Sequence, residues 1–291
     1  MYIEVYPKLS GRIAVGMRKT QARLESMARS EFINRELAAP ASHLLSTKGK
    51  MLRPLLVFAG AAAIREVPDN FVRLASAVEL LHTSSMIHDD IIDGDLVRRG
   101  VMTVHAKYGA GRAIIAGDAL ISKAVEESAE YGPKVIGMVS KVAMEMCAGE
   151  ALDYAWQRNR QTPNMKEYLR IAHLKSSSLL GTSASIVAAY RKSRLQRNLY
   201  SFGDNFGIAF QIRDDIIDAL GLETRKHGTD LRKYRPNIVK TLMEHRGMGK
   251  AQAIAEAKAI NQRYVHLATR SLDRLDCAAD LTSYANLVLL K

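Results

Sequence analysis

The stretch HDDIID at residues 88–93 and the stretch RDDIID at 213–218 repeat one acidic pattern within a single chain. In an α-helix, residues four apart lie on the same face, about one turn from each other. Two carboxylates of each stretch should therefore project side by side, where like charges repel. The pairs are Asp89 with Asp93 and Asp214 with Asp218. A solvated helix surface would tolerate one such pair, but two pairs in a basic protein indicate sites that bind a cation.

The donor chemistry of the two stretches favours a small, hard metal ion. Carboxylate oxygens without a set of His or Cys ligands suit magnesium, with manganese as an alternative, and no D-x-D-x-D-G loop for calcium is present. Magnesium usually takes one or two protein carboxylates and completes its coordination with water and phosphate oxygens. Basic residues follow both stretches, at 98–99 and within 226–235, although either run alone is typical of a solvated surface. Together these features predict binding of a polyphosphate.

Composition agrees with an anionic ligand and excludes several classes of protein. The 291 residues are 47% apolar, and 42 Lys and Arg against 30 Asp and Glu leave a net charge of +12. Two cysteines are too few for a disulfide scaffold, which favours a reducing compartment. The first residues lack the apolar core of a secretory signal, and no apolar run reaches the roughly 18 residues that span a bilayer. We therefore expect a cytoplasmic protein without a transmembrane segment.

Helix-forming residues dominate the chain and predict an all-α fold. Apolar residues recur at helical spacing near 74–85, 136–146 and 208–220, whereas alternation typical of strands is scarce. No linker or low-complexity tract marks a boundary, so we expect one domain over 1–291 with about ten or more helices. The polar, glycine-containing segment 221–237 is predicted to be a mobile lid. Breaks between helices are expected near Pro40, Pro68, Gly100, Pro133 and Pro163.

From about residue 45 to about 240, the chain resembles the trans-isoprenyl diphosphate synthases, with the family's motifs in the family's order. The segments that carry the resemblance are KGKMLRP at 48–54, ELLHTSSMIHDDIIDGDLVRRG at 79–100, LKSSSLLG at 174–181, FGIAFQIRDDIIDALG at 206–221 and KHGTD at 226–230. As a set these segments are highly specific. The resemblance implies an antiparallel helical bundle around a deep central cavity, a homodimer, and magnesium-dependent head-to-tail condensation of isopentenyl diphosphate with an allylic diphosphate.

The resemblance also implies roles for individual residues. The isopentenyl diphosphate would be bound by Lys50, Arg53, His82 and Arg99. Metal ions would be bound by Asp89, Asp93, Asp214, Asp215 and Asp218. The allylic diphosphate and its departure would involve Arg98, Lys175, Ser176, Lys226 and Arg235, with Gln211 near the reacting carbons. A lone histidine on an apolar helix is more often a core residue, but His82 lies two turns before Asp89, which favours a ligand.

Departures from the family pattern affect the first motif, the lid and the length of the product. Lys48 replaces a glycine, and Tyr234-Arg235-Pro236-Asn237 replaces the usual Gly-Lys-x-Thr. Family members that make short products carry a bulky aromatic residue five positions before the first aspartate. Here that position is Ser84, followed by Ser85, with Leu81 one turn deeper. We therefore expect a product of twenty carbons or more, and a shorter one if Ser84 is replaced by Phe.

Other functions explain fewer of these features. A class I terpene cyclase would normally carry a different second metal motif, and a non-catalytic subunit that depends on a partner would tend to lose aspartates. Nucleic-acid binding would account for the charge, but no zinc-finger spacing or aromatic RNA-binding motif is present. Dinucleotide and P-loop fingerprints are missing, as are the Glu-x-x-His sets of metal-storage bundles. The sequence thus favours an enzyme, a polyprenyl diphosphate synthase.

Overall fold

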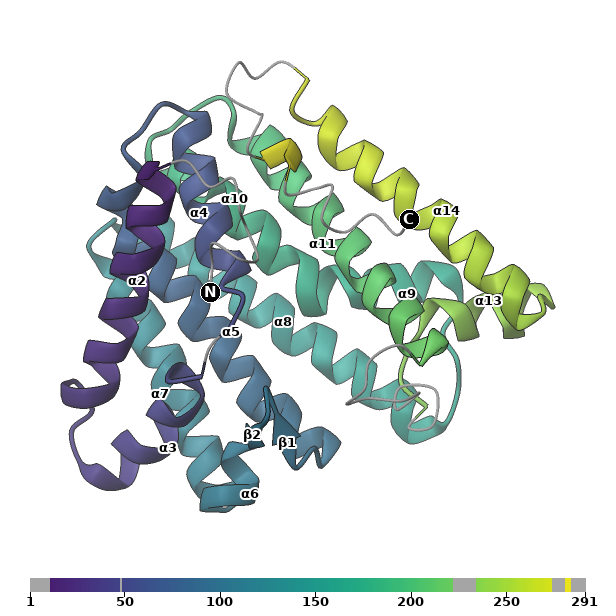
Figure 1. Ribbon diagram of the computed structural model, residues 1–291, viewed down its shortest axis with the longest axis horizontal. Coiled ribbons are helices and arrows are strands. Elements are labelled where there is room, and N and C mark those ends of the chain that lie inside the picture. Colours follow the sequence, from purple (N-terminus) through teal and green to yellow (C-terminus); the bar gives the residue numbers. More distant parts are fainter. Residues whose placement is uncertain (1–10, 48, 222–233, 274–280, 284–291) are drawn as a thin grey trace. The chain divides into compact units, whose positions relative to one another are not determined.

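The computed structural model describes residues 11–47, 49–221, 234–273 and 281–283, and these form two compact units (Figure 1). The first unit comprises Met1–Lys141 and Ile186–Gln196, and the second comprises Val142–Ser185 and Arg197–Lys291. Helices make up most of the described residues, which confirms the all-α prediction. The single domain and the central cavity stay predictions. So does the lid predicted over 221–237, because 222–233 lie outside the described residues.

The elements of the first unit are α2 (Gly11–Ser30), α3 (Arg35–Leu45), α4 (Leu52–Ala63), the short helix η1 (Pro68–Phe71), α5 (Val72–Asp93), β1 (Val97–Arg98), β2 (Val101–Met102), α6 (Val104–Tyr108) and α7 (Ala110–Ala129). Two helices pass from one unit into the other, α8 (Pro133–Asn159) and α10 (Ser178–Tyr190). The second unit also contains α9 (Met165–Ala172), the π-helical turn η2 (His173–Ser177), α11 (Gln196–Leu220), α13 (Ile238–Arg246) and α14 (Lys250–Arg270).

Helix α5 forms the core of the first unit, where it packs along α7 and also contacts α2 and α4 (Figure 1). The predicted periodicity holds here, since Leu74, Val78 and Leu81 are all buried. The two long helices come close together where the Ser84 hydroxyl donates a hydrogen bond to the Gly117 carbonyl at 2.9 Å. A Cβ atom at position 117 would overlap the His88 ring, so this ring packs in the space that Gly117 leaves.

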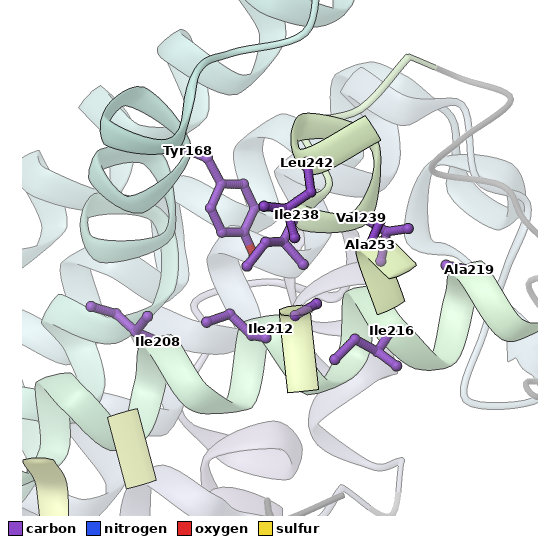
Figure 2. Close-up of a cluster of buried hydrophobic side chains, with 10 residues drawn as sticks. Tyr168, Ile208, Ile212, Ile216, Ala219, Ile238, Val239, Leu242 and Ala253 are labelled. Carbon is purple, nitrogen blue, oxygen red and sulfur yellow. The ribbon is translucent and has the colours of Figure 1, made fainter. Parts of the chain in front are cut away.

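In the second unit, helix α11 presents an apolar stripe to α9, α13 and α14 (Figure 2). Ile208, Ile212 and Ile216 lie four residues apart on one face and are buried. The side chains that pack against this stripe are Tyr168, Ile238, Val239, Leu242, Ala253 and Ala257. This burial fixes the rotation of α11 about its axis. The aspartates of α11, which alternate with the end of this stripe, therefore have defined directions.

One predicted break is wrong. Pro40 lies inside α3 and is buried, instead of ending a helix. A proline inside a helix costs one backbone hydrogen bond. This helix nevertheless continues, with Ala41, Leu44 and Leu45 buried in its second half. The other breaks predicted at prolines are confirmed, since Pro68 and Pro133 begin helices and Pro163 lies between α8 and α9.

Candidate active site

The first aspartate cluster lies at the C-terminal end of α5, which stops at Asp93 with Gly94 in the left-handed conformation, φ 65°. Asp89 and Asp93 are partly exposed on one face, as predicted. Carboxylates in the last turns of a helix face the negative end of the helix dipole in addition to repelling each other. Their oxygen-only chemistry and partial exposure fit a magnesium ion, which would compensate both effects.

The middle aspartate of this cluster has different surroundings. Asp90 is fully buried, and Arg98 Nε donates to its Oδ1 at 2.5 Å. Burial raises the pKa of Asp90, and the Arg98 charge opposes that rise. Arg98 is thus held by an internal carboxylate, with a side chain that is 20% exposed. The cluster divides into two carboxylates open to solvent and one that anchors an arginine.

A tight hairpin positions Arg98 and Arg99. Strands β1 and β2 pair antiparallel with Val97 opposite Met102, so the loop between them has two residues. Both have positive φ, 52° for Arg99 and 81° for Gly100, which is typical of a type I′ turn. A non-glycine residue in this region is uncommon, and here the two-residue turn requires it. The sequence analysis did not predict this hairpin.

The hairpin places Arg99 beside the predicted isopentenyl diphosphate residues of the first unit. Arg99 Nη1 lies 3.4 Å from Thr47 Oγ1, and Nη2 lies 3.6 Å from Met86 Sδ. Its guanidinium covers Gly49, where a Cβ atom would approach Arg99 Cζ to 2.9 Å. A side chain at position 49 would therefore displace the Arg99 guanidinium from this place.

Arg53 and His82 are brought together, as the sequence analysis expected. Arg53 Nη1 lies 2.9 Å from His82 Nε2. Burial lowers the pKa of His82 well below its usual range, and the charges of Arg53 and Arg99 lower it further. His82 is therefore neutral and accepts the hydrogen bond from Arg53 through Nε2. Lys50, by contrast, is exposed.

In the second unit, the turn η2 carries Lys175 between two glycines. A Cβ atom on Gly149 of α8 would overlap the Lys175 backbone, and one on Gly207 of α11 would overlap Ser177. A π-helical turn inserts one extra residue per turn and often occurs at functional sites. Here it directs Lys175 into ion pairs with Glu150, at 2.7 Å, and with Asp153. The analysis of the sequence missed both acids, although they lie three residues apart beside Gly149.

The second aspartate cluster shares only the buried middle carboxylate with the first, because its outer Asp218 is buried as well. Asp215 is buried and accepts three hydrogen bonds, each 2.8 Å long. The donors are Tyr168 Oη, Gln211 Nε2 and the backbone amide of Ile238. Because these bonds engage both oxygens, Asp215 fits a structural role better than the predicted role of metal ligand.

The outer aspartates of this cluster differ in exposure. The Asp214 side chain is 44% exposed, whereas Asp218 is 6% exposed. Ser176 Oγ lies 3.5 Å from Gln211 Oε1, so these two predicted residues are neighbours. Arg235 is partly buried, and Lys226 lies outside the described residues. Within the described ranges, no three His, Cys, Asp or Glu side chains form a group that could hold a metal ion.

The solved structures that this chain resembles define its class. The geranylgeranyl pyrophosphate synthetase of the archaeon Geoglobus acetivorans matches with a TM-score of 0.87 at 26% identity, covering 96% of this chain and 99% of that one. The arrangement of helices is that of the all-α isoprenyl diphosphate synthases. Among the described helices, none combines the length and apolar character needed to cross a membrane.

The chain belongs to the polyprenyl synthetase family, whose model matches residues 34–257. It is 35% identical over 189 residues to the geranylgeranyl pyrophosphate synthase of Geoglobus acetivorans, an alignment that covers 62% of this chain and 59% of the relative. It is 30% identical over 258 residues to a short chain isoprenyl diphosphate synthase of Methanothermobacter thermautotrophicus, covering 81% and 79%. The chain thus spans about three fifths of the first relative and about four fifths of the second.

The hydrogen bonds of Asp215 predict that Asp215→Asn lowers thermal stability, by about 1–3 kcal/mol, because an amide offers one acceptor oxygen to three donors. Asp214→Asn, at the adjacent exposed position, should change stability by no more than about 0.5 kcal/mol. Thermal unfolding followed by far-ultraviolet circular dichroism checks both variants. Equal melting temperatures would contradict the different roles of these two aspartates.

Proposed function

We propose that this protein is a magnesium-dependent trans-prenyltransferase that condenses isopentenyl diphosphate head-to-tail with an allylic diphosphate. The observation that carries the proposal is the repeated cluster geometry: each acidic stretch pairs outer carboxylates at helical spacing with a buried middle carboxylate. Membership of the polyprenyl synthetase family supports the same chemistry. The cations expected for two diphosphates are also present, in Arg53 and Arg99 of the first unit and Lys175 of the second.

In this mechanism the allylic carbon–oxygen bond breaks, and the diphosphate leaves with the electron pair. The double bond of isopentenyl diphosphate attacks the resulting cation, and loss of a proton restores a double bond. Magnesium, when bound, supplies positive charge for the departing diphosphate. The chain's own residues bind and orient the substrates. Lys175 and Arg98 bind the allylic diphosphate. Gln211, which Asp215 holds, lies near the reacting carbons. Each of the two cations is held by carboxylates in the described structure.

The proposed activity is tested with purified protein, magnesium, labelled isopentenyl diphosphate and, in turn, dimethylallyl, geranyl and farnesyl diphosphate. We expect elongated prenyl diphosphates, and we expect Asp89→Ala and Asp214→Ala to abolish them with unchanged helical circular dichroism. Glu36→Ala removes an exposed carboxylate of α3 whose side chain is 76% exposed and should leave turnover unchanged.

Three outcomes would contradict the proposed function or favour a different one. Full activity in both aspartate variants would contradict the assignment of the clusters. Conversion of an allylic diphosphate without incorporation of isopentenyl diphosphate would indicate a terpene cyclase. No product with any primer, from folded protein that binds magnesium, would indicate a subunit that requires a partner chain.

We propose that the product has twenty carbons or more. Its length depends, in this proposal, on the residues of α5 that precede Asp89 on the same face of the helix. Ser84 and Ser85 have different surroundings, because adjacent helical residues point about 100° apart. Ser84 is 1% exposed and donates to Gly117 on α7, whereas Ser85 is partly exposed and shares the face of Asp89 four residues later. Leu81 is buried, 2% exposed.

A bulky residue at position 85 should therefore shorten the product. Ser85→Phe adds an aromatic ring on the face of Asp89, so we expect product lengths to shift downward with activity retained. Ser84→Phe, the substitution suggested by sequence, would press against the α7 backbone at Gly117 and should lower the melting temperature as well. Chromatography of the labelled products measures the lengths, and an unchanged Ser85→Phe product would place the control of length elsewhere.

We infer that the protein forms a homodimer through an exposed apolar stripe on the second part of α8. The residues of the stripe are Met144, Cys147, Ala148, Ala151 and Tyr154, all exposed; Cys147 and Ala148 are adjacent, and the other steps are three residues. Met144 is 70% exposed, and it adjoins the other apolar residues of the stripe, a continuity that is typical of an interaction surface. A cytoplasmic location also belongs to this proposal, and the free thiol of Cys147 suits a reducing compartment.

The dimer predicts that Ala151→Glu halves the mass in solution, because a carboxylate in the middle of the stripe would be buried without a partner. Light scattering on the purified protein measures the mass. Ala255→Glu makes the same substitution at an exposed position of α14 and should leave the mass unchanged. A dimeric Ala151→Glu variant would contradict an interface at this stripe.

A further inference from the structure

Glu79 is a buried acid of α5 that the proposed mechanism does not use. Its side chain belongs to a residue only 4% exposed, and its Oε2 atom has no hydrogen-bond partner among the described residues. Burying a carboxyl group without a hydrogen bond costs several kcal/mol unless nearby charge compensates it. An acid kept in such a place therefore requires an explanation.

The face of α5 that carries Glu79 is also the face that contacts three arginines. Residues 79, 82, 86 and 90 follow at spacings of three and four, so they form one stripe along the helix. Three of these positions each contact an arginine: His82 contacts Arg53, Met86 contacts Arg99, and Asp90 contacts Arg98. Glu79 occupies the remaining position, at the end of the stripe furthest from the metal-binding aspartates.

Glu79 lies one helical turn before His82, whose ring contacts Arg53. Burial has the largest effect on the pKa of Glu79 and raises it, whereas the positive charges of Arg53 and Arg99 act in the opposite direction. These are the two arginines expected to bind isopentenyl diphosphate. Arg98, expected to bind the allylic diphosphate, has its own buried carboxylate in Asp90.

Two guanidinium groups that converge on one ligand repel each other before the ligand arrives. His82 does not relieve this repulsion, because it is neutral and only accepts a hydrogen bond from Arg53. A buried carboxylate near both groups offsets their repulsion and restricts the positions they adopt. Binding energy is then not spent on ordering the side chains.

We propose that Glu79 is a positioning residue that holds Arg53 and Arg99 in the geometry that binds the diphosphate of isopentenyl diphosphate. The inference rests on the proposed function and identifies the residue that orders one of its two substrate sites. Glu79 acts through the two arginines and touches neither substrate. It therefore affects the binding of isopentenyl diphosphate and leaves the allylic diphosphate unaffected.

The test compares the wild type with Glu79→Gln, which keeps the shape of the side chain and removes its charge. We expect the KM for isopentenyl diphosphate to rise at least tenfold, with the KM for the allylic diphosphate and kcat within about twofold of the wild type. Glu79→Asp keeps the charge on a shorter chain and should recover part of the loss. Calorimetric titration with isopentenyl diphosphate should show the same order of affinities, whether or not the protein turns over.

Glu127→Gln is the matched control, since Glu127 is also a buried acid of the first unit and pairs with Arg23 and Arg73. It should lower the melting temperature without a selective effect on isopentenyl diphosphate. An unchanged affinity in Glu79→Gln, or equal losses for both substrates, would overturn the inference. If Glu79→Gln does not fold, Glu79→Asp takes its place, since the shorter side chain moves the carboxylate: a smaller loss of affinity confined to isopentenyl diphosphate is then expected, and equal losses for both substrates would overturn the inference. A wild type that makes no product would contradict the proposed function instead, and the titration would still test Glu79.

Discussion

The buried carboxylate of Asp215 is the interaction on which the second unit depends. It joins three helices, because its partners lie on α9, on α11 itself and at the first residue of α13. The amide of Ile238 belongs to the positive end of α13, so the helix dipole favours a negative charge there. Asn237 reinforces the junction by capping α13 and donating to the Asp215 carbonyl. This junction fixes the orientation of α11 and therefore the directions of its outer aspartates.

Much of the fold followed from the sequence, because periodicity reports burial directly. The stripes of α5 and α11 bury Leu74, Val78, Ile212 and Ile216 as their spacing predicts. Pro40 shows the limit of such local rules, since packing of the residues after it maintains α3. Local propensity describes an isolated segment, and tertiary contacts override it where enough apolar surface is buried.

The candidate site was predicted less completely, for a physical reason. Spacing within a helix shows which carboxylates share a face, but only the fold shows which of them are buried. Asp90 and Asp215 therefore could not be separated from their neighbours by pattern alone. The ion pairs of Lys175 with Glu150 and Asp153 join segments more than twenty residues apart. The close approach at Gly149 that makes them possible leaves only a glycine as its signal in the sequence.

The hairpin between β1 and β2 has a consequence for how the chain tolerates insertions and deletions. The last strand residue and the first loop residue of this hairpin have fixed and different directions, so Arg98 of β1 reaches Asp90 while Arg99 of the loop reaches Thr47 and Met86. A change of one residue in this loop would shift the register and exchange the sides on which the two cations lie. The length of the loop, as much as the identity of the arginines, is therefore under constraint.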